Sequence, residues 1–76
     1  MHIQYSKQAI KFLNKVDLQT RNRIVSAIHT IPNGDIKKLK GRTGYRLRVG
    51  SYRIIFDKSG NIICIEKIDN RGQVYK

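Results

Sequence analysis

One stretch, Tyr45–Phe56, constrains the fold of this 76-residue chain more than any other. It contains two runs in which β-branched or aromatic residues alternate with polar ones, separated by the dipeptide Gly50-Ser51. This dipeptide fits a type II′ turn, because glycine accepts the positive φ of the first central position. A two-residue turn fixes the register, so Arg48 should lie directly opposite Arg53. The stretch therefore predicts a β-hairpin.

The two faces of this hairpin should differ in chemistry, because side chains alternate between the faces of a strand. The apolar face would hold Tyr45, Leu47, Val49, Tyr52, Ile54 and Phe56, and the opposite face Arg46, Arg48, Arg53 and Ile55. Like charges opposite each other destabilise a sheet by up to about 1 kcal/mol. Either the arginines form a merely solvated face, or an anion from outside supplies the missing charge. A polyphosphate backbone would fit, since guanidinium groups match phosphate oxygens in bidentate geometry.

The charge of the chain indicates its class of partner. The formal net charge is +11 and the pI is near 10.3, which favours nucleic acid or an acidic protein. A membrane surface is not expected, because the basic residues do not follow one amphipathic helix. No apolar run reaches the roughly 18 residues of a membrane span, and residues 1–5 do not begin a signal peptide. We therefore expect a cytoplasmic protein.

Size and cysteine content limit the architecture. A chain of 76 residues has too little interior for two cores, so we expect one domain over residues 1–76. The single cysteine, Cys64, lies in an apolar run and is interpreted as a buried strand residue in a reducing compartment. The sequence offers no disulfide and no cluster of metal ligands. We therefore expect neither a metal nor another cofactor.

The periodicity of the remaining chain predicts two helices and further strands. Residues 2–5 alternate as a first strand, and Ser6 is placed to cap a helix with one buried stripe. Asp17 is placed to cap a second helix, which Pro32-Asn33-Gly34 ends. Residues 62–69 form the last strand. The order β-α-α-β-β-β predicts an α+β fold in which a helix hairpin packs on one face of an antiparallel sheet.

A basic segment, residues 35–44, precedes the hairpin and is interpreted as a loop. It carries Lys37, Lys38, Lys40 and Arg42. Such charge runs are usually only solvated, but this one leads directly into the arginine-bearing strand. We therefore interpret these four residues as a candidate RNA-binding set that extends the positive field of the hairpin.

Three features give the chain a resemblance to a known family over nearly its whole length. They are the strand-helix-helix-strands order, the segment 38–41 that leads into 45–53, and the ending 69–76. The chain resembles the RelE/ParE superfamily of type II toxin–antitoxin toxins, and its ending resembles the RelE branch. The resemblance implies a ribosome-dependent endoribonuclease that cuts messenger RNA without a metal ion and so inhibits translation.

The resemblance also implies which residues act in cleavage. By position they are Arg46, Arg48, Arg53, Arg71 and Tyr75. The first three match the basic residues of the two hairpin strands, and the last two match an arginine after the final strand and a terminal tyrosine. The match has two departures. Some relatives have lysines at positions 46 and 48, and many have histidine where this chain has Asn70.

Cleavage of this kind needs a proton acceptor as well as cations. The ribose 2′-hydroxyl must lose a proton and attack the adjacent phosphorus in line, while negative charge builds on the phosphoryl oxygens. Arg48, Arg53 and Arg71 suit the stabilisation of that charge. Arginine, with a pKa above about 12, is a poor base, and neither histidine falls in the hairpin or the tail. Tyr75 is the best candidate, unless it stacks on a base or seals a sheet edge.

Two other functions stay open from the sequence. One is a ParE-like toxin that inhibits DNA gyrase by binding, and the other is a basic RNA- or ribosome-binding module without activity. The gathering of arginines with a tyrosine favours the nuclease, because a binding inhibitor does not need it. The expected partners are the ribosome, messenger RNA and an acidic antitoxin that covers apolar surface and neutralises the positive face. The toxin–antitoxin complex would bind operator DNA through the antitoxin.

Overall fold

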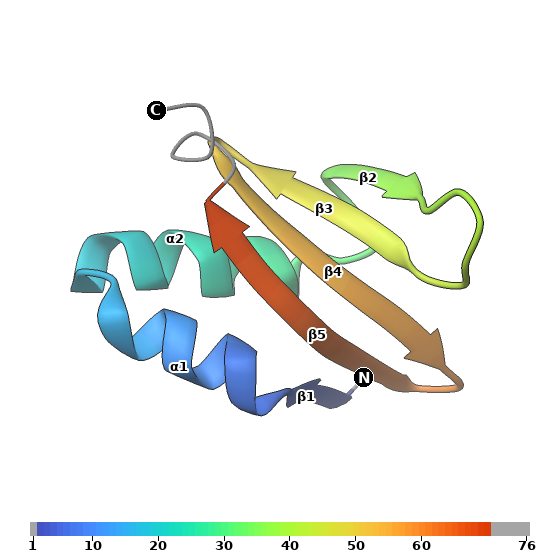
Figure 1. The fold of residues 1–76 in the computed structure, drawn as a ribbon, viewed down its shortest axis with the longest axis horizontal. Coiled ribbons are helices and arrows are strands. Elements are labelled where there is room, and N and C mark those ends of the chain that lie inside the picture. Colours follow the sequence, from blue (N-terminus) through green and yellow to red (C-terminus); the bar gives the residue numbers. More distant parts are fainter. Residues whose placement is uncertain (1, 71–76) are drawn as a thin grey trace.

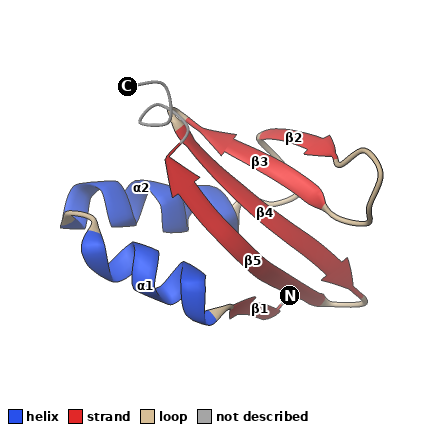
Figure 2. Cartoon of the chain, viewed as in Figure 1, coloured by secondary structure: helices blue, strands red, loops and turns tan. Residues whose placement is uncertain are grey.

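The fold is a five-stranded sheet with two helices against one of its faces, seen in a computed structural model that describes residues 2–70 (Figure 1). The elements are β1 (His2–Tyr5), α1 (Lys7–Lys15), α2 (Leu18–His29), β2 (Asp35–Lys38), β3 (Tyr45–Val49), β4 (Tyr52–Ser59) and β5 (Ile62–Asn70). The strand order is β1-β5-β4-β3-β2. Figure 2 shows both helices on the same side of the strands. The predicted α+β architecture with a helix hairpin on one face is therefore confirmed.

The sheet differs from the expectation in two respects. First, β1 pairs with β5 in parallel, with Ile3 beside Ile63, so the sheet is mixed and not wholly antiparallel. A parallel pair needs a long connection, and the helices and three strands between β1 and β5 provide it. Alternation within residues 2–5 predicts a strand but carries no information on its direction.

Second, part of the predicted basic loop is a strand. Residues 35–38 pair with β3 in antiparallel register, and Ile36 faces Leu47 on the side of the core. This pairing satisfies backbone groups of β3 that would otherwise be unpaired at a sheet edge. The lysines of β2 then lie on the outermost strand, where charged side chains discourage pairing with a further chain.

The first helix is tied to β5 by polar side chains. The Ser6 hydroxyl accepts a hydrogen bond from the Ala9 amide at 3.1 Å, as the predicted cap should, and donates to the Glu66 carbonyl at 2.7 Å. Beyond the end of β1, the Gln8 side-chain amide donates to the Ile68 carbonyl and accepts from the Ile68 amide, both at 2.9 Å. Gln8 thus makes the hydrogen bonds that a neighbouring strand would make with β5, beyond the residues that pair with β1.

The second helix begins as predicted but lacks the predicted side-chain cap. Asp17 has the extended backbone of an N-cap residue, and its carbonyl accepts the Arg21 amide at 2.9 Å. Its side chain makes no capping hydrogen bond. Separately, the Arg21 side chain donates to the Leu13 carbonyl at 2.8 Å and links α2 to the last turns of α1. The helix ends at His29, before Pro32.

The core lies between the helices and the predicted apolar face of the hairpin. Its fully buried members include Ala9, Ile24, Ile28, Leu47, Ile54, Phe56, Ile65 and Ile68. Two aromatic contacts extend it, since Phe12 meets Tyr52 edge to face and Tyr45 stacks on Phe56. Burial of one large apolar side chain contributes about 1.5–3 kcal/mol, so this face anchors the hairpin. Cys64 lies in β5 as predicted but is only half-buried.

The hairpin turn has the predicted geometry. Gly50 has a φ of +60°, and all five predicted pairs between β3 and β4 are present, including Arg48 opposite Arg53. A side chain at position 50 would also meet the Arg23 guanidinium, whose Nη2 lies 2.8 Å from an ideal Cβ. The turn therefore selects glycine for its backbone conformation, whereas the end of the flexible Arg23 side chain could move to make room for a larger residue.

A β-bulge in β5 interrupts its alternation. Ile55 pairs with Lys67 and Phe56 pairs with Ile65, which leaves Glu66 as an extra residue. Without this residue, Lys67 and Asp69 would share a face with Ile65. With it, Ile68 joins Ile65 in the core, and Lys67 and Asp69 lie on the arginine-bearing face. A bulge of this kind redirects every side chain that follows it.

Within residues 2–70, no helix is long and apolar enough to span a membrane. The same residues contain no group of three or more His, Cys, Asp or Glu side chains that could hold a metal ion.

Candidate functional site

The face of the sheet opposite the helices carries two cross-strand rows of different charge. The balanced row consists of Asp35, Arg48, Arg53 and Asp69, and the cationic row of Lys37, Arg46, Ile55 and Lys67. Each row crosses β2, β3, β4 and β5, and the two are neighbours on the same face. The prediction that Arg46, Arg48, Arg53 and Ile55 share one face is thereby confirmed.

In the balanced row, an aspartate flanks the arginine pair at each end. Arg53 Nη2 lies 2.9 Å from Asp69 Oδ2, and each of these side chains is only about a quarter exposed (27% and 26%). Arg48 Nε lies 3.7 Å from Asp35 Oδ2, and both of these side chains are about half exposed. The counter-charge for these arginines therefore comes partly from the chain itself, a source that neither of the two interpretations of the sequence included.

The Arg53–Asp69 pair retains unused hydrogen-bonding groups. Arg53 Nε and Asp69 Oδ1 are both buried, and neither has a hydrogen-bond partner. Lys67 Nζ approaches Asp69 Oδ2 at 3.9 Å and adds a second cation. An unsatisfied buried donor or acceptor costs about 1–3 kcal/mol. This pair therefore keeps one donor and one acceptor that the described residues do not satisfy.

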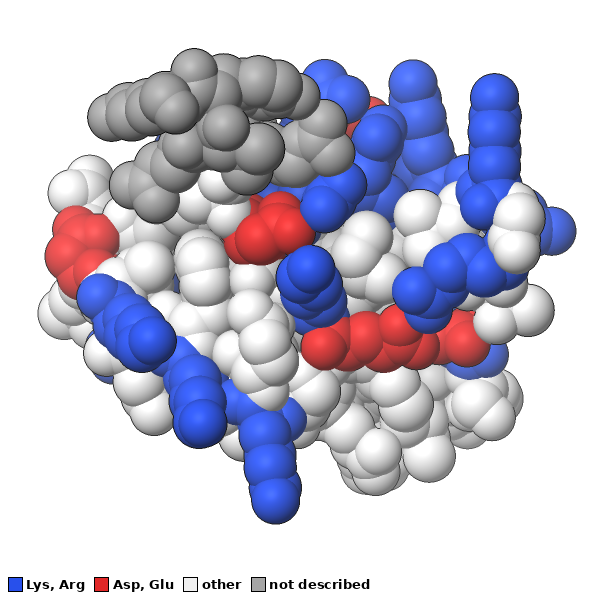
Figure 3. Space-filling view, viewed as in Figure 1, with Lys and Arg blue, Asp and Glu red and all other residues white. Residues whose placement is uncertain are grey.

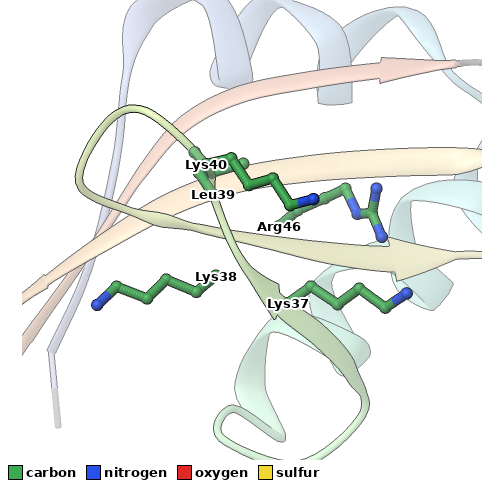
Figure 4. Close-up of a pocket in the computed structure, with 5 residues that line it drawn as sticks. All are labelled: Lys37, Lys38, Leu39, Lys40 and Arg46. Atoms are coloured by element: carbon green, nitrogen blue, oxygen red, sulfur yellow. The ribbon is translucent and has the colours of Figure 1, made fainter.

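The cationic row borders a shallow pocket without a carboxylate. The pocket has a volume of about 240 Å³ and is lined by Lys37, Lys38, Leu39, Lys40 and Arg46 (Figure 4). Its four cations form no ion pair with any carboxylate of residues 2–70. Figure 3 shows Lys and Arg side chains gathered over this end of the molecule, around β2 and β3. The pocket is thus a concentrated positive field.

The predicted RNA-binding set does not stay together. Lys37, Lys38 and Lys40 line the pocket, with the Lys38 side chain directed away from the other two (Figure 4), but Arg42 is held in an ion pair with Glu66 at 2.7 Å. The guanidinium of Arg42 is therefore directed to the bulge in β5. Arg46, which the resemblance predicts to be catalytic, lines the pocket together with these lysines.

Two of the predicted catalytic residues, Arg71 and Tyr75, lie outside the described residues. The chain reaches them from Asn70, which pairs with Tyr52 at the end of β5, one residue after Asp69. The sequence did not predict Asp35 and Asp69 as partners of the arginines. The register of β3 with β4 was available from the turn, but the registers of β2 and β5 were not.

The only resolved change in acidity among the described residues lies away from both rows. Burial raises the pKa of the Tyr5 hydroxyl on β1. Its side chain packs against the core, so Tyr5 has a structural role and replaces none of the candidate site residues.

Comparison with known proteins identifies the family. Residues 3–75 match the family of the ParE toxin of the type II toxin–antitoxin system parDE. The chain is 33% identical over 84 residues to Toxin RelE3 of Methanocaldococcus jannaschii, a match covering 99% of this chain and 96% of that protein. This chain belongs to the RelE/ParE superfamily. It is a toxin of a type II toxin–antitoxin system, of the RelE family.

Solved structures of RelE/ParE toxins share the fold. The toxin in the RelB–RelE complex from Methanococcus jannaschii matches with a TM-score of 0.76 and 31% identity, over 95% of this chain and 94% of that chain. The archaeal RelE–RelB complex from Pyrococcus horikoshii matches with a TM-score of 0.74 and 26% identity, over 95% and 96%. Both relatives were crystallised with an antitoxin, which supports an antitoxin partner for this RelE-family chain.

Proposed function

We propose that this toxin is a ribosome-dependent endoribonuclease that cleaves messenger RNA by attack of the 2′-hydroxyl. The observation that carries the proposal is the placement of Arg46, Arg48 and Arg53 on one open face, away from the helix layer. The three arginines lie on paired strands of a rigid sheet. A phosphodiester lying on that face would meet cations fixed before it arrives, which is the arrangement that stabilises developing charge.

The chemistry is a transfer within the RNA. The 2′-hydroxyl gives up its proton to a base, and its oxygen bonds to phosphorus as the bond to the 5′-oxygen breaks. The leaving 5′-oxygen takes a proton from water, and the products are a 2′,3′-cyclic phosphate and a 5′-hydroxyl. In this scheme Arg48 and Arg53 stabilise the phosphoryl oxygens. Arg71 supplies a further cation, and Tyr75 is the proton acceptor proposed from the sequence. The ribosome would hold the nucleotide in the bent conformation that in-line attack requires.

The cationic surface of β2 and β3 also suits an acidic antitoxin. An acidic antitoxin, mostly unfolded when free, would lie over the cations of β2 and β3 and neutralise the toxin while adding its own folding to the complex. We further propose that the complex binds operator DNA through the antitoxin and that the toxin acts in the cytoplasm, where ribosomes and messenger RNA are found.

A second candidate function is inhibition of DNA gyrase by binding. It is supported by the match of residues 3–75 to the family described as the ParE toxin of parDE. A gyrase inhibitor would need the surface of the toxin but not proton transfer. An inactive RNA- or ribosome-binding module would need only the positive field.

Primer extension on a defined messenger RNA, with and without programmed ribosomes, tests the proposal. The variants are Arg53→Ala and the charge-conserving Arg53→Lys, with Lys11→Ala on the exposed face of α1 as the matched control. We expect new breaks that require ribosomes, persist in Lys11→Ala and disappear in Arg53→Ala. Intact RNA together with arrested growth would transfer support to the gyrase inhibitor. Intact RNA without arrest would favour the inactive module.

A further inference from the structure

Four cations line the pocket beside β2, and two of them are paired across adjacent strands. Lys37 lies directly opposite Arg46 across the ladder between β2 and β3. Such a like-charge pair destabilises the sheet, and no aspartate or glutamate of residues 2–70 forms an ion pair with it. The neighbouring arginine pair, Arg48 and Arg53, has an aspartate at each end. An uncompensated cation pair beside a compensated one indicates that an anion binds there.

The loop after β2 brings a third cation to the same place. The Leu39 amide donates to the Gly44 carbonyl at 3.0 Å and closes residues 39–44 into a compact loop. Gly44 has a φ of +115°, and a Cβ at this position would lie 3.2 Å from the Phe56 carbonyl oxygen, so only glycine fits comfortably. This closure holds Lys40 over β3. In Figure 4 the Lys40 and Arg46 side chains extend in the same direction as Lys37.

The pocket also offers an unused donor and an apolar wall. Arg46 Nε is buried and has no hydrogen-bond partner, although its guanidinium lines the pocket. Leu39 is half-buried and supplies the apolar part of the lining. A site with several cationic donors, no acceptor side chain and an adjacent apolar surface matches a phosphodiester with its attached sugar.

We propose that Lys37, Lys40 and Arg46 form a phosphate-binding subsite that holds one backbone phosphate of a single-stranded RNA next to the cleaved bond. The identity of the ligand rests on the proposed ribonuclease function. The subsite assigns Arg46 to binding and leaves Arg48 and Arg53 for stabilisation of the reacting phosphate. Truncation of Arg46 should therefore raise KM, whereas truncation of Arg53 should lower kcat.

Binding of a fluorescent single-stranded oligodeoxynucleotide, measured by anisotropy over a salt series, tests the subsite without chemistry, because this probe has no 2′-hydroxyl. The variants are Lys37→Gln, Lys40→Gln and Arg46→Gln, and Lys11→Gln on α1 is the charge-matched control. Each pocket variant should weaken binding about two- to fivefold at low salt and reduce the slope of log K against log salt by about 0.7–1. Lys11→Gln should change neither quantity.

A double variant distinguishes one shared phosphate from scattered contacts. If Lys40 and Arg46 hold the same phosphate, the Lys40→Gln/Arg46→Gln variant should lose less affinity than the product of the two single losses, because contacts to one ligand group are not independent. Inorganic tripolyphosphate should displace the probe from the wild type more effectively than from Arg46→Gln. Multiplicative losses, a loss in Lys11→Gln equal to the others, or no measurable binding by the wild type would each overturn the subsite.

Two further measurements keep the result interpretable. Circular dichroism and urea unfolding show whether each variant is folded, and removal of a like charge should if anything stabilise the sheet. The binding assay also separates this inference from the proposed function. A wild-type protein that binds the probe through the pocket but does not cut messenger RNA on ribosomes would contradict the nuclease and leave the subsite standing. If Arg46→Gln leaves the KM of ribosome-dependent cleavage unchanged, the result would contradict the subsite and leave the nuclease standing.

Discussion

The balanced row and the cationic row have nearly the same backbone but opposite electrostatic roles. Both cross the same four strands, yet the first contains two aspartates and two arginines and the second contains three cations and a buried isoleucine. In the balanced row, internal carboxylates fix the arginines and lower the cost of bringing them together. In the cationic row, Lys67 reaches Asp69, but no carboxylate of residues 2–70 forms an ion pair with Lys37 or Arg46. The comparison shows that a positive face is not uniform: one part is organised by the chain and the other is open to a ligand.

The largest expected difference between the rows is in catalysis. Arg53→Ala should lower kcat on programmed ribosomes by about 10²–10³-fold, the usual loss for one preorganised donor at a developing charge. Arg46→Ala should mainly raise KM. Initial rates of cleavage over a range of programmed-ribosome concentrations, with toxin limiting, measure both parameters. Equal effects of the two variants on kcat would remove the distinction between the rows.

The next effect concerns stability. Asp69→Ala leaves the Arg53 guanidinium without its partner in a site where both side chains are about a quarter exposed. Breaking a fully buried pair costs about 3–5 kcal/mol, so with the partial exposure we expect a loss of about 1–3 kcal/mol in the free energy of unfolding.

Glu66→Gln is the matched control for this loss. It breaks the Arg42–Glu66 pair, which is shorter at 2.7 Å but more exposed, at 56% and 38%. Urea unfolding should show a loss below about 1 kcal/mol for Glu66→Gln. A larger loss for Glu66→Gln than for Asp69→Ala would mean that distance, and not burial, sets the strength of these pairs.

In the cationic row, removal of a charge should stabilise the protein. Lys37→Thr relieves the repulsion of Arg46 and places a β-branched residue in a strand, so the free energy of unfolding should rise by about 0.2–1 kcal/mol. Because the charges are exposed, the gain should shrink when the salt concentration is raised from about 0.05 M to 1 M. Thermal unfolding at the two salt concentrations measures it. A gain that does not depend on salt would have to come from strand propensity alone.

The smallest effect should come from the outer end of the balanced row. Asp35 and Arg48 are separated by 3.7 Å, and both are about half exposed. We expect Asp35→Asn to change the free energy of unfolding by less than about 0.5 kcal/mol. A loss as large as that of Asp69→Ala would show that both ends of the row are equally important for holding the arginines.

The sequence predicts the hairpin well because its information is local. The turn Gly50-Ser51 specifies a register, and the register specifies which side chains share a face. Ser6 and the stripe of α1 are predicted for the same reason, since a cap and a helical period involve only neighbouring residues. The helix-covered α+β fold follows from these elements, together with the RelE/ParE resemblance.

The features that the sequence did not predict, such as β2 and the bulge in β5, depend on pairing between distant segments. Residues 35–38 look like a charged loop, and they are a strand because β3 has a free edge for them. In β5, strict alternation from Ile63 and Ile65 would place Asp69 in the core, and the bulge at Glu66 reverses that assignment. Neither pairing has a local signal, so the aspartates that organise Arg48 and Arg53 could not be identified from the sequence. Arg46 lies beside Lys37 because residues 35–38 form a strand, and the sequence did not predict that strand.

The contacts of β1 and Gln8 with β5 determine when the toxin can finish folding during its synthesis. The first strand to leave the ribosome pairs with residues 62–65, and Gln8 bonds to Ile68, so both wait for the last strand to be synthesised. Contacts between such distant positions delay folding until their partners exist. The nascent toxin thus completes its sheet, and the arrangement of its arginines, only when nearly all of residues 2–70 have emerged. Its activity should therefore appear late in synthesis and all at once.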